Sequence, residues 1–235
     1  MKSPISLRPL RFKKSYLPHA EGSCLVSMGN TQVLCVASVE ETVPKHAEEK
    51  NTGWVTAEYA MLPRAGEHRS ARNKVNSGGR VQEISRLVGR SLRAAVDLSL
   101  IGKRTITIDC DVIRADGGTR TASINGGFVA LAQALLLLRK RGQLPEWPLK
   151  DFVGAVSVGV FRNGPVLDLC YLEDKDAEAD VNVVMTGSGK LIEIQGTAEG
   201  RPFSKKELNR LVDLSAAGIR SIIKAQKKTL GTLPQ

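Results

Sequence analysis

Residues 109–121 combine the residue types that hold an anion at the start of a helix. They read Asp-Cys-Asp-Val-Ile-Arg-Ala-Asp-Gly-Gly-Thr-Arg-Thr, and the alternating residues just before them are typical of a strand. The glycine pair lets backbone amides approach a ligand closely, and the first amides of a helix lack internal partners. Thr119 and Thr121 add hydroxyl groups, and Arg120 adds a planar guanidinium. The segment therefore predicts an anion site, with a capped strand-to-helix connection as the plain alternative.

An acidic segment, residues 171–180, is the second candidate for chemistry. Asp174 and Asp180 flank a predicted turn between two strands, so that both carboxylates can converge on one point. Two convergent carboxylates suit a hard cation such as Mg²⁺, or acid and base catalysis, whereas a solvated acidic loop is the plain alternative. Together with an anion site and a row of arginines, the carboxylate pair indicates chemistry on phosphodiesters.

The chain is strongly basic, which favours a polyanionic partner. Its 235 residues carry a formal net charge of +10, and only 4% of them are aromatic. RNA or DNA is the leading candidate, and contacts to phosphates should outweigh base stacking. A generally basic surface without such a partner is the alternative.

Residues 62–80 have no apolar periodicity and contain a row of arginines, at Arg64, Arg69, Arg72 and Arg80. Basic loops suit contacts to a phosphate backbone, although a solvated run of charge is the commoner case. Arg80 stands at the start of a predicted helix, where a cation opposes the helix dipole. Its position indicates either an external anion or a salt bridge to a carboxylate.

Four cysteines lie in apolar, strand-like runs, at Cys24, Cys35, Cys110 and Cys170. Because none forms a Cys-x-x-Cys pair, the pattern argues against a zinc site and favours buried free thiols in a reducing cytoplasm. The N-terminal residues lead into no hydrophobic signal core. No run of about 18 apolar residues is present, so that no membrane span is expected.

The apolar patterns predict an α+β fold in a single domain that spans residues 1–235. Strands are expected just before residue 109 and at 24–28, 33–39, 54–61, 154–161, 166–171, 179–185 and 191–196. Helices are expected at 81–100, 123–140 and 205–228, and a capping box of Ser204 and Glu207 begins the last. Residues 1–18 and 41–53 are expected to be irregular.

Five groups of residues, in order along the chain, resemble ribonuclease PH. They are Gly-Trp-Val-Thr-Ala-Glu-Tyr at 53–59, Gly-Gly-Arg at 78–80, Ala-Asp-Gly-Gly-Thr-Arg-Thr-Ala-Ser at 115–123, Glu-Asp at 173–174 with Asp-Val-Asn-Val-Val-Met-Thr at 180–186, and Gln-Gly-Thr-Ala-Glu-Gly at 195–200. The match runs from about residue 8 to about residue 228. Several motifs in the right order make it more specific than a lone glycine signature.

The resemblance implies a fold, an activity and an assembly. The fold is the ribonuclease PH variety of the ribosomal protein S5 domain 2-like fold, with mixed sheets packed with helices. The activity is phosphate-dependent 3′→5′ exoribonuclease action on tRNA precursors, with rRNA a further RNA substrate, and the reverse reaction is nucleotidyltransferase activity. The assembly is a homo-oligomer, a hexameric ring built as a trimer of dimers. Inorganic phosphate is the co-substrate, and no membrane is involved.

The resemblance also implies roles for individual residues. Phosphate binding is implied at Arg80, Gly118, Thr119 and Arg120. Catalytic carboxylates that act through Mg²⁺ are implied at Asp174 and Asp180. Arginines that grip the RNA are implied, by spacing, at Arg64, Arg69 and Arg72.

One residue and two other functions stay open at this point. Lys175 and Asp176 stand where the family commonly has small residues, and Lys175 would either weaken metal binding at Asp174 or point to solvent. A non-catalytic RNA-binding subunit of a ring is a second function class, but such a subunit would have lost the arginines or the aspartates. A phosphotransferase that uses a nucleoside triphosphate is a third, against which the missing Gly-rich triphosphate loop argues.

Overall fold

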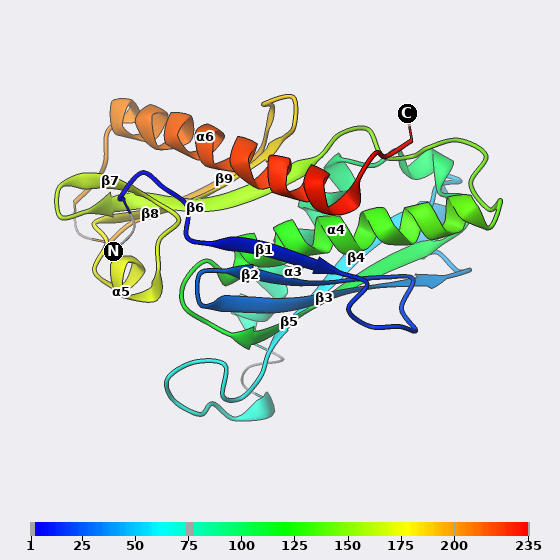
Figure 1. The fold of residues 1–235 in the computed structure, drawn as a ribbon, viewed down its shortest axis with the longest axis horizontal. Coiled ribbons are helices and arrows are strands. Elements are labelled where there is room, and N and C mark those ends of the chain that lie inside the picture. Colours follow the sequence, from blue (N-terminus) through cyan, green and yellow to red (C-terminus); the bar gives the residue numbers. More distant parts are fainter. Residues whose placement is uncertain (1–2, 74–77, 200, 235) are drawn as a thin grey trace.

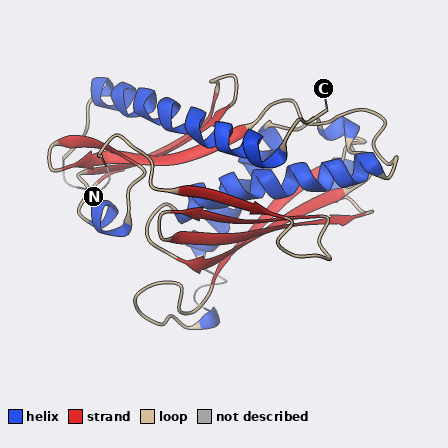
Figure 2. Cartoon of the chain, in the orientation of Figure 1, coloured by secondary structure: helices blue, strands red, loops and turns tan. Residues whose placement is uncertain are grey.

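The computed structural model describes residues 3–73, 78–199 and 201–234, and it places them in two β-sheets and three long helices (Figure 1). One long helix runs between the two sheets, and another covers the outer face of the smaller sheet (Figure 2). The α+β class expected from the sequence is confirmed.

The larger sheet has five strands in the order β1-β2-β3-β5-β4. Their bounds are β1 Leu10–Lys14, β2 Gly22–Met28, β3 Thr31–Glu40, β4 Trp54–Met61 and β5 Thr105–Arg114. All neighbours are antiparallel except β4 and β5, which run parallel. Alternate residues of β2 and β3 are fully buried because one face of this sheet packs against helices.

The smaller sheet has four antiparallel strands in the order β7-β6-β8-β9. Their bounds are β6 Val153–Phe161, β7 Gly164–Leu167, β8 Ala179–Thr186 and β9 Leu191–Ala198. Every residue of β6 except the last is buried, because helices cover both of its faces. This burial explains why the strand is a continuous apolar run rather than an alternating one.

The helix between the sheets, α4 at Thr119–Lys140, has apolar residues spread around its axis rather than gathered in one stripe. Such a pattern marks a helix that is buried on every side. By length and composition α4 could cross a membrane, but 83% of its most apolar stretch is buried inside the protein, as in the core helix of a folded domain. It packs against β2 and β3 on one side and against β6 on the other, so that both sheets share one hydrophobic core.

The two other long helices are α3 at Gly79–Ala94, which packs on β4, and α6 at Lys205–Leu230, which packs on β6 and β1. The capping box expected at the start of α6 is confirmed, because Ser204 accepts from the Glu207 amide and the Glu207 carboxylate accepts from the Ser204 amide. The short helices are α1 at Lys45–Glu48, α5 at Tyr171–Lys175 and the 3-10 turn η1 at Leu98–Leu100.

Several predicted elements need correction. Residues 1–18 are not irregular throughout, because β1 pairs with β2, and residues 41–53 include α1. The helix expected at 81–100 ends at Ala94, after which Val96 pairs with Leu149 and η1 follows. The helix expected at 123–140 begins earlier, at Thr119, because Gly118 adopts a left-handed conformation that starts it.

The strand expected at 166–171 is also wrong in its second half. It ends at Leu167, since Asp168 has a positive φ of 57° and leaves the sheet. The helix α5 then begins, with Glu173 accepting a hydrogen bond from the Cys170 amide at 2.9 Å. Residues 171–175 are therefore helical rather than an acidic loop.

Gly126 lies where α4 touches the larger sheet most closely. A Cβ atom at this position would come within 2.6 Å of Val26 Cγ1 and 2.7 Å of Cys35 Sγ, both fully buried. The glycine weakens the helix by roughly 1 kcal/mol relative to alanine, but it permits this approach.

We expect Gly126→Ala to lower the free energy of unfolding by about 1–3 kcal/mol, because overpacking outweighs the gain in helix propensity. Chemical denaturation measures the change. Gly79→Ala is the control, since no atom lies within 4 Å of a Cβ there, and it should not destabilise the protein. Equal stability of Gly126→Ala and the parent protein would contradict the packing argument.

Candidate active site

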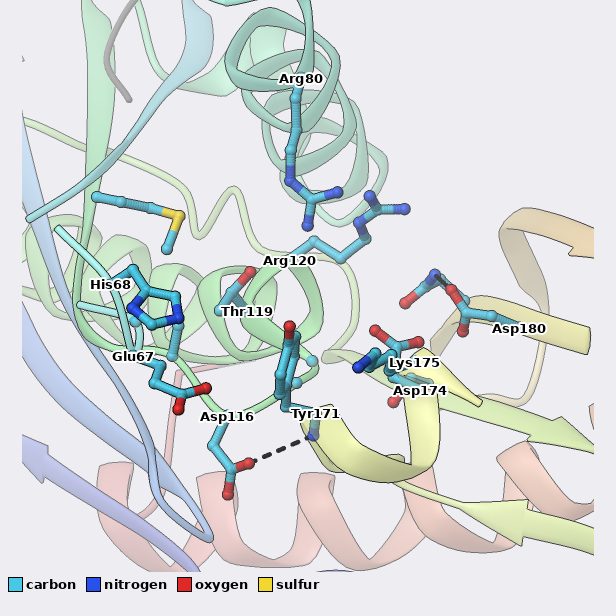
Figure 3. A pocket seen from close by; sticks show the side chains of 17 residues that line it. Glu67, His68, Arg80, Asp116, Thr119, Arg120, Tyr171, Asp174, Lys175 and Asp180 are labelled. Carbon is cyan, nitrogen blue, oxygen red and sulfur yellow. Dashed lines mark hydrogen bonds between the residues drawn. The ribbon is translucent and has the colours of Figure 1, made fainter. Parts of the chain in front are cut away.

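The ends of α3, α4, α5 and β8 converge on one cavity of about 720 Å³ (Figure 3). The loop that follows β4 closes its other side. The cavity is lined by Met61, Gly66, Glu67, His68, Arg80, Ala115, Asp116, Gly117, Gly118, Thr119, Arg120, Ser157, Tyr171, Asp174, Lys175, Asp180 and Asn182. Six of the residues singled out from the sequence thus meet in one place: Arg80, Gly118, Thr119, Arg120, Asp174 and Asp180.

The glycine turn between β5 and α4 forms the floor of this cavity. Gly117 and Gly118 have φ values of +75° and +66°, which side chains rarely adopt. A Cβ at Gly117 would lie 2.6 Å from the Leu169 carbonyl oxygen. Only glycine therefore allows the larger sheet to approach the segment that leads into α5.

The first turn of α4 faces the cavity without a side-chain cap at Gly118. Uncapped amides at a helix start are suited to anions. Thr119 lines the cavity, and its hydroxyl accepts a hydrogen bond from Tyr59 at 2.9 Å, which leaves its own proton for a ligand. Thr121 differs from the expectation: it is fully buried, and its hydroxyl donates to the Gly118 carbonyl.

Two guanidinium groups stand above this helix start. Arg80 is exposed at the beginning of α3, whose first turn contains no acidic residue. Arg120 lies 3.7 Å from the Glu83 carboxylate of α3, a long ion pair that orients the side chain without neutralising it closely. Figure 3 shows both arginines directed toward the same space. The arrangement can hold a multiply charged anion such as phosphate.

Arg8 holds the floor of the site in place, and its role could not be read from the sequence. Its guanidinium binds the Asp168 carboxylate through two nitrogens, at 3.0 and 2.6 Å, and its backbone amide binds the same group at 2.8 Å. The guanidinium also donates to the carbonyls of Asp116 and Gly117. Both members of the ion pair are buried. Arg8 therefore fastens the glycine turn to the end of β7.

Further hydrogen bonds secure the same turn from the β2–β3 hairpin. The Thr31 hydroxyl donates to the Gly117 carbonyl at 2.6 Å and accepts from the Asp116 amide at 2.9 Å. The Asp116 carboxylate accepts from Asn30 and from the backbone amide of Tyr171. The glycine turn is thus preorganised by neighbours from three elements.

Asp174 and Asp180 face the cavity from α5 and β8 (Figure 3). Burial raises the pKa of Asp174, and Arg120 and Arg80 oppose this rise. Burial, together with the charge of Asp174, raises the pKa of Asp180 to about 6. The Oδ2 atom of Asp180 accepts from Asn182 at 3.4 Å, whereas its buried Oδ1 atom has no hydrogen-bond partner among the described residues.

This carboxylate pair fits a hard divalent cation. An orphaned, buried carboxylate oxygen beside a second carboxylate is an oxygen donor set of the kind Mg²⁺ takes. Among the described residues, no group of three or more His, Cys, Asp or Glu side chains forms a complete metal cage. A bound Mg²⁺ would therefore keep several waters or take oxygens from a phosphate ligand.

The three arginines expected to contact RNA lie outside the cavity. Arg64 and Arg69 are exposed in the loop that follows β4, and Arg72 is exposed at a helical position just after it. Other residues of this loop, Gly66, Glu67 and His68, form one side of the cavity. The arginines therefore belong to the same segment as one side of the cavity but do not line it.

Comparison with known proteins identifies the family. Residues 6–136 match domain 1 of the 3′ exoribonuclease family, and residues 151–218 match domain 2. A ribonuclease PH from Moorella thermoacetica is 54% identical over 230 residues, which cover 97% of this chain and 92% of that relative. The chain belongs to the 3′ exoribonuclease family.

Solved structures share the fold at low sequence identity. Rice (Oryza sativa) Rrp46 superposes with a TM-score of 0.79 at 20% identity, covering 97% of this chain and 98% of that one. An Archaeoglobus fulgidus exosome, solved with RNA bound to the active site, gives 0.80 at 20% identity, covering 95% and 90%. An archaeal exosome core gives 0.77 at 21% identity, covering 97% and 89%. The ribonuclease PH fold expected from the sequence is confirmed.

We expect Arg8→Ala to reduce the free energy of unfolding by about 3–5 kcal/mol, because it leaves the Asp168 carboxylate buried without its main partner. Chemical denaturation measures the loss. Arg11→Ala, at an exposed position of β1, should change stability by less than about 0.5 kcal/mol. A similar effect of both substitutions would contradict the fastening role of Arg8.

The pKa of Asp180 predicts how stability depends on pH. The folded protein holds this proton up to about pH 6, whereas the unfolded chain releases it near its usual value of about 3.9. Because the folded state binds more protons in this window, the free energy of unfolding falls as pH rises from about 4 through 6. Asp180→Asn should flatten this part of the curve in chemical denaturation at a series of pH values. Asp213→Asn, at an exposed position of α6, should leave the curve unchanged.

Proposed function

We propose that this chain removes nucleotides from the 3′ end of RNA by phosphorolysis and that tRNA precursors are its substrates. Family membership supports a 3′ exoribonuclease, and the 54% identical relative is named ribonuclease PH. The observation that carries the proposal is the meeting of an anion-binding helix start, two arginines and two carboxylates in one cavity. In the reverse direction the same site would add nucleotides to RNA 3′ ends.

The cations of the cavity would hold inorganic phosphate for attack. Arg80 and Arg120 offset the repulsion between phosphate and the RNA backbone, while the Thr119 hydroxyl and the turn at Gly118 fix its orientation. An oxygen of the held phosphate attacks the terminal phosphorus, and the bond to the 3′ oxygen of the preceding nucleotide breaks. The products are a nucleoside diphosphate and an RNA that is one nucleotide shorter. Holding the two reactants in line supplies much of the rate enhancement.

Asp174 and Asp180 would hold Mg²⁺, which is the cation their oxygens suit. When bound, such an ion stabilises negative charge on the transferring phosphoryl group and on the leaving oxygen. The two aspartates must be ionised for this role, and the raised pKa of Asp180 makes that requirement sensitive to mild acid. The nearby Arg120 and Arg80 favour the ionised form of both carboxylates.

Three further features belong to the proposal. Arg64, Arg69 and Arg72 would contact the RNA backbone as it approaches the entrance. The enzyme would act in the cytoplasm, where its four free cysteines stay reduced, and rRNA would be a further substrate. It would assemble as a hexameric ring, a trimer of dimers, which analytical ultracentrifugation would test directly.

The decisive experiment is the release of nucleoside diphosphate from a 3′-extended tRNA with Mg²⁺, with and without inorganic phosphate. We expect release that requires phosphate. We also expect Asp174→Asn to abolish release while RNA binding persists, because the carboxylates lie apart from the exposed arginines. Asp176→Asn is the matched control, since Asp176 is exposed and does not line the cavity.

Other outcomes of this experiment would overturn the proposal. Release of nucleoside monophosphate that ignores phosphate would mean hydrolysis and would remove the role assigned to Arg80 and Arg120. Tight RNA binding without release would favour a non-catalytic ring subunit. Near-normal turnover of Asp174→Asn would remove the role of the carboxylate pair.

We expect the combined change of Arg64, Arg69 and Arg72 to alanine to weaken tRNA binding and to reduce its salt dependence. Loss of three phosphate contacts lowers the slope of log affinity against log salt by roughly 2 to 3. Filter binding at several salt concentrations measures this slope. Removal of the same charge from exposed positions on α6, by changing Arg210, Arg220 and Lys224 to alanine, should leave the slope unchanged. Equal slopes for the two triple variants would exclude the loop arginines from RNA contact.

A further inference from the structure

The cavity has a second wall, formed by α5, that the phosphate site does not use. Tyr171, Asp174 and Lys175 all line the cavity from this one short helix. Tyr171 and Lys175 are four residues apart, so that their side chains share one face of the helix. This face looks across the cavity toward the start of α4, where Thr119 and Arg120 lie (Figure 3).

The Tyr171 ring is available to a ligand. It is 51% exposed, and among the described residues it is the one exposed large apolar side chain that lines the cavity. No stacking or cation contact to this ring occurs within the part of the chain that the structure describes. Its backbone amide donates to Asp116 Oδ1 at 3.3 Å, which fixes the start of α5 relative to the glycine turn. A positioned aromatic ring with a free face suits a nucleobase.

The Lys175 ammonium is also available to a ligand. Within residues 3–73, 78–199 and 201–234 it forms no hydrogen bond or ion pair. The cations that most lower the pKa of the adjacent Asp174 are Arg120, Arg80 and Arg8, not Lys175. A lysine that lines a cavity without pairing to its acidic neighbour leaves its charge for an anionic ligand.

We propose that Tyr171 and Lys175 form a nucleotide subsite that holds the 3′-terminal residue of the RNA, with the ring against the base and the ammonium against its phosphate. The inference rests on the proposed function and assigns its second substrate to the α5 wall. Inorganic phosphate then occupies the opposite wall, at Arg80, Thr119 and Arg120. The two walls together bind a nucleoside diphosphate, which is the product of the reaction.

A single ring would place little demand on the identity of the terminal base. Every base has a π-face, so that stacking on one tyrosine tolerates all four bases. The chain is only 4% aromatic and carries a net charge of +10, which leaves most of the RNA contact to phosphates. Tyr171 is therefore where base contact would be concentrated.

The test is direct binding of ADP and of inorganic phosphate, measured separately by calorimetry on the full-length protein with Mg²⁺. We expect Tyr171→Ala to lower the affinity for ADP about tenfold, as loss of one stacked base predicts, and to leave the affinity for phosphate unchanged. Tyr171→Phe should retain ADP affinity. Lys175→Ala should lower the affinity for ADP about threefold, whereas Lys175→Arg should retain most of that affinity.

Leu172→Ala is the matched control, because Leu172 belongs to the same helix and is 70% exposed but does not line the cavity. Equal ADP affinity in Tyr171→Ala, Leu172→Ala and the parent protein would overturn the subsite. Weakened binding of phosphate as well as ADP would place these residues at the phosphate site and would also overturn it. A parent protein that binds ADP in this way but releases no nucleoside diphosphate from RNA would instead overturn the proposed function.

Discussion

The contact between the glycine turn and the segment leading into α5 is the constraint on which the site depends. Gly117 approaches the Leu169–Tyr171 backbone so closely that any side chain would collide with it. Arg8 bridges the same junction by binding Asp168 on one side and two turn carbonyls on the other. Since the turn follows the larger sheet and Asp168 follows β7 of the smaller one, this junction sets the position of one sheet's residues relative to the other's.

The junction explains why basic and acidic side chains from different parts of the fold meet in one cavity. Arg80 and Arg120 come with α3 and α4, which pack on the larger sheet, whereas Asp174 and Asp180 come with α5 and β8 of the smaller half. Brought together, the arginines lower the pKa of both carboxylates while burial raises it. The balance leaves the pKa of Asp180 at about 6, so that its charge changes in mildly acidic solution. A shift of about 1 Å at such a junction would strongly reduce the reaction rate, because the reacting groups must be held in a precise arrangement.

The buried helix α4 connects the site to both sheets. Its N-terminus lines the cavity, and its body lies between the two sheets, so that the site is attached to a largely buried helix. Asn125, fully buried on this helix, exchanges two hydrogen bonds of 2.8 Å with Ala155 of β6 and links the helix to the smaller sheet by polar contacts as well. Sites on such rigid elements hold their geometry better than sites on loops.

The sequence by itself determined the α+β class, the main strands, the helix at the C-terminus with its capping box, and the residues of the phosphate and carboxylate motifs. These features depend on local patterns of period two or 3.6 and on short motifs, which a chain displays without its tertiary contacts. Of these predictions, the structure confirms the fold. It also brings six of the predicted site residues to one cavity, but their roles stay predictions: Arg80, Gly118, Thr119, Arg120, Asp174 and Asp180.

Only the tertiary structure decided what depends on residues that are distant in sequence. Arg8 reads as one of several basic residues near the N-terminus until its partner 160 residues away is known. The start of α4 at Thr119 depends on two left-handed glycines held by neighbours from other elements, and α5 replaces an expected strand and loop because Asp168 turns the chain out of the sheet. The environment of Tyr171 and Lys175 was likewise invisible in the sequence, because a local pattern specifies which side chains share a helix face but not which cavity that face meets.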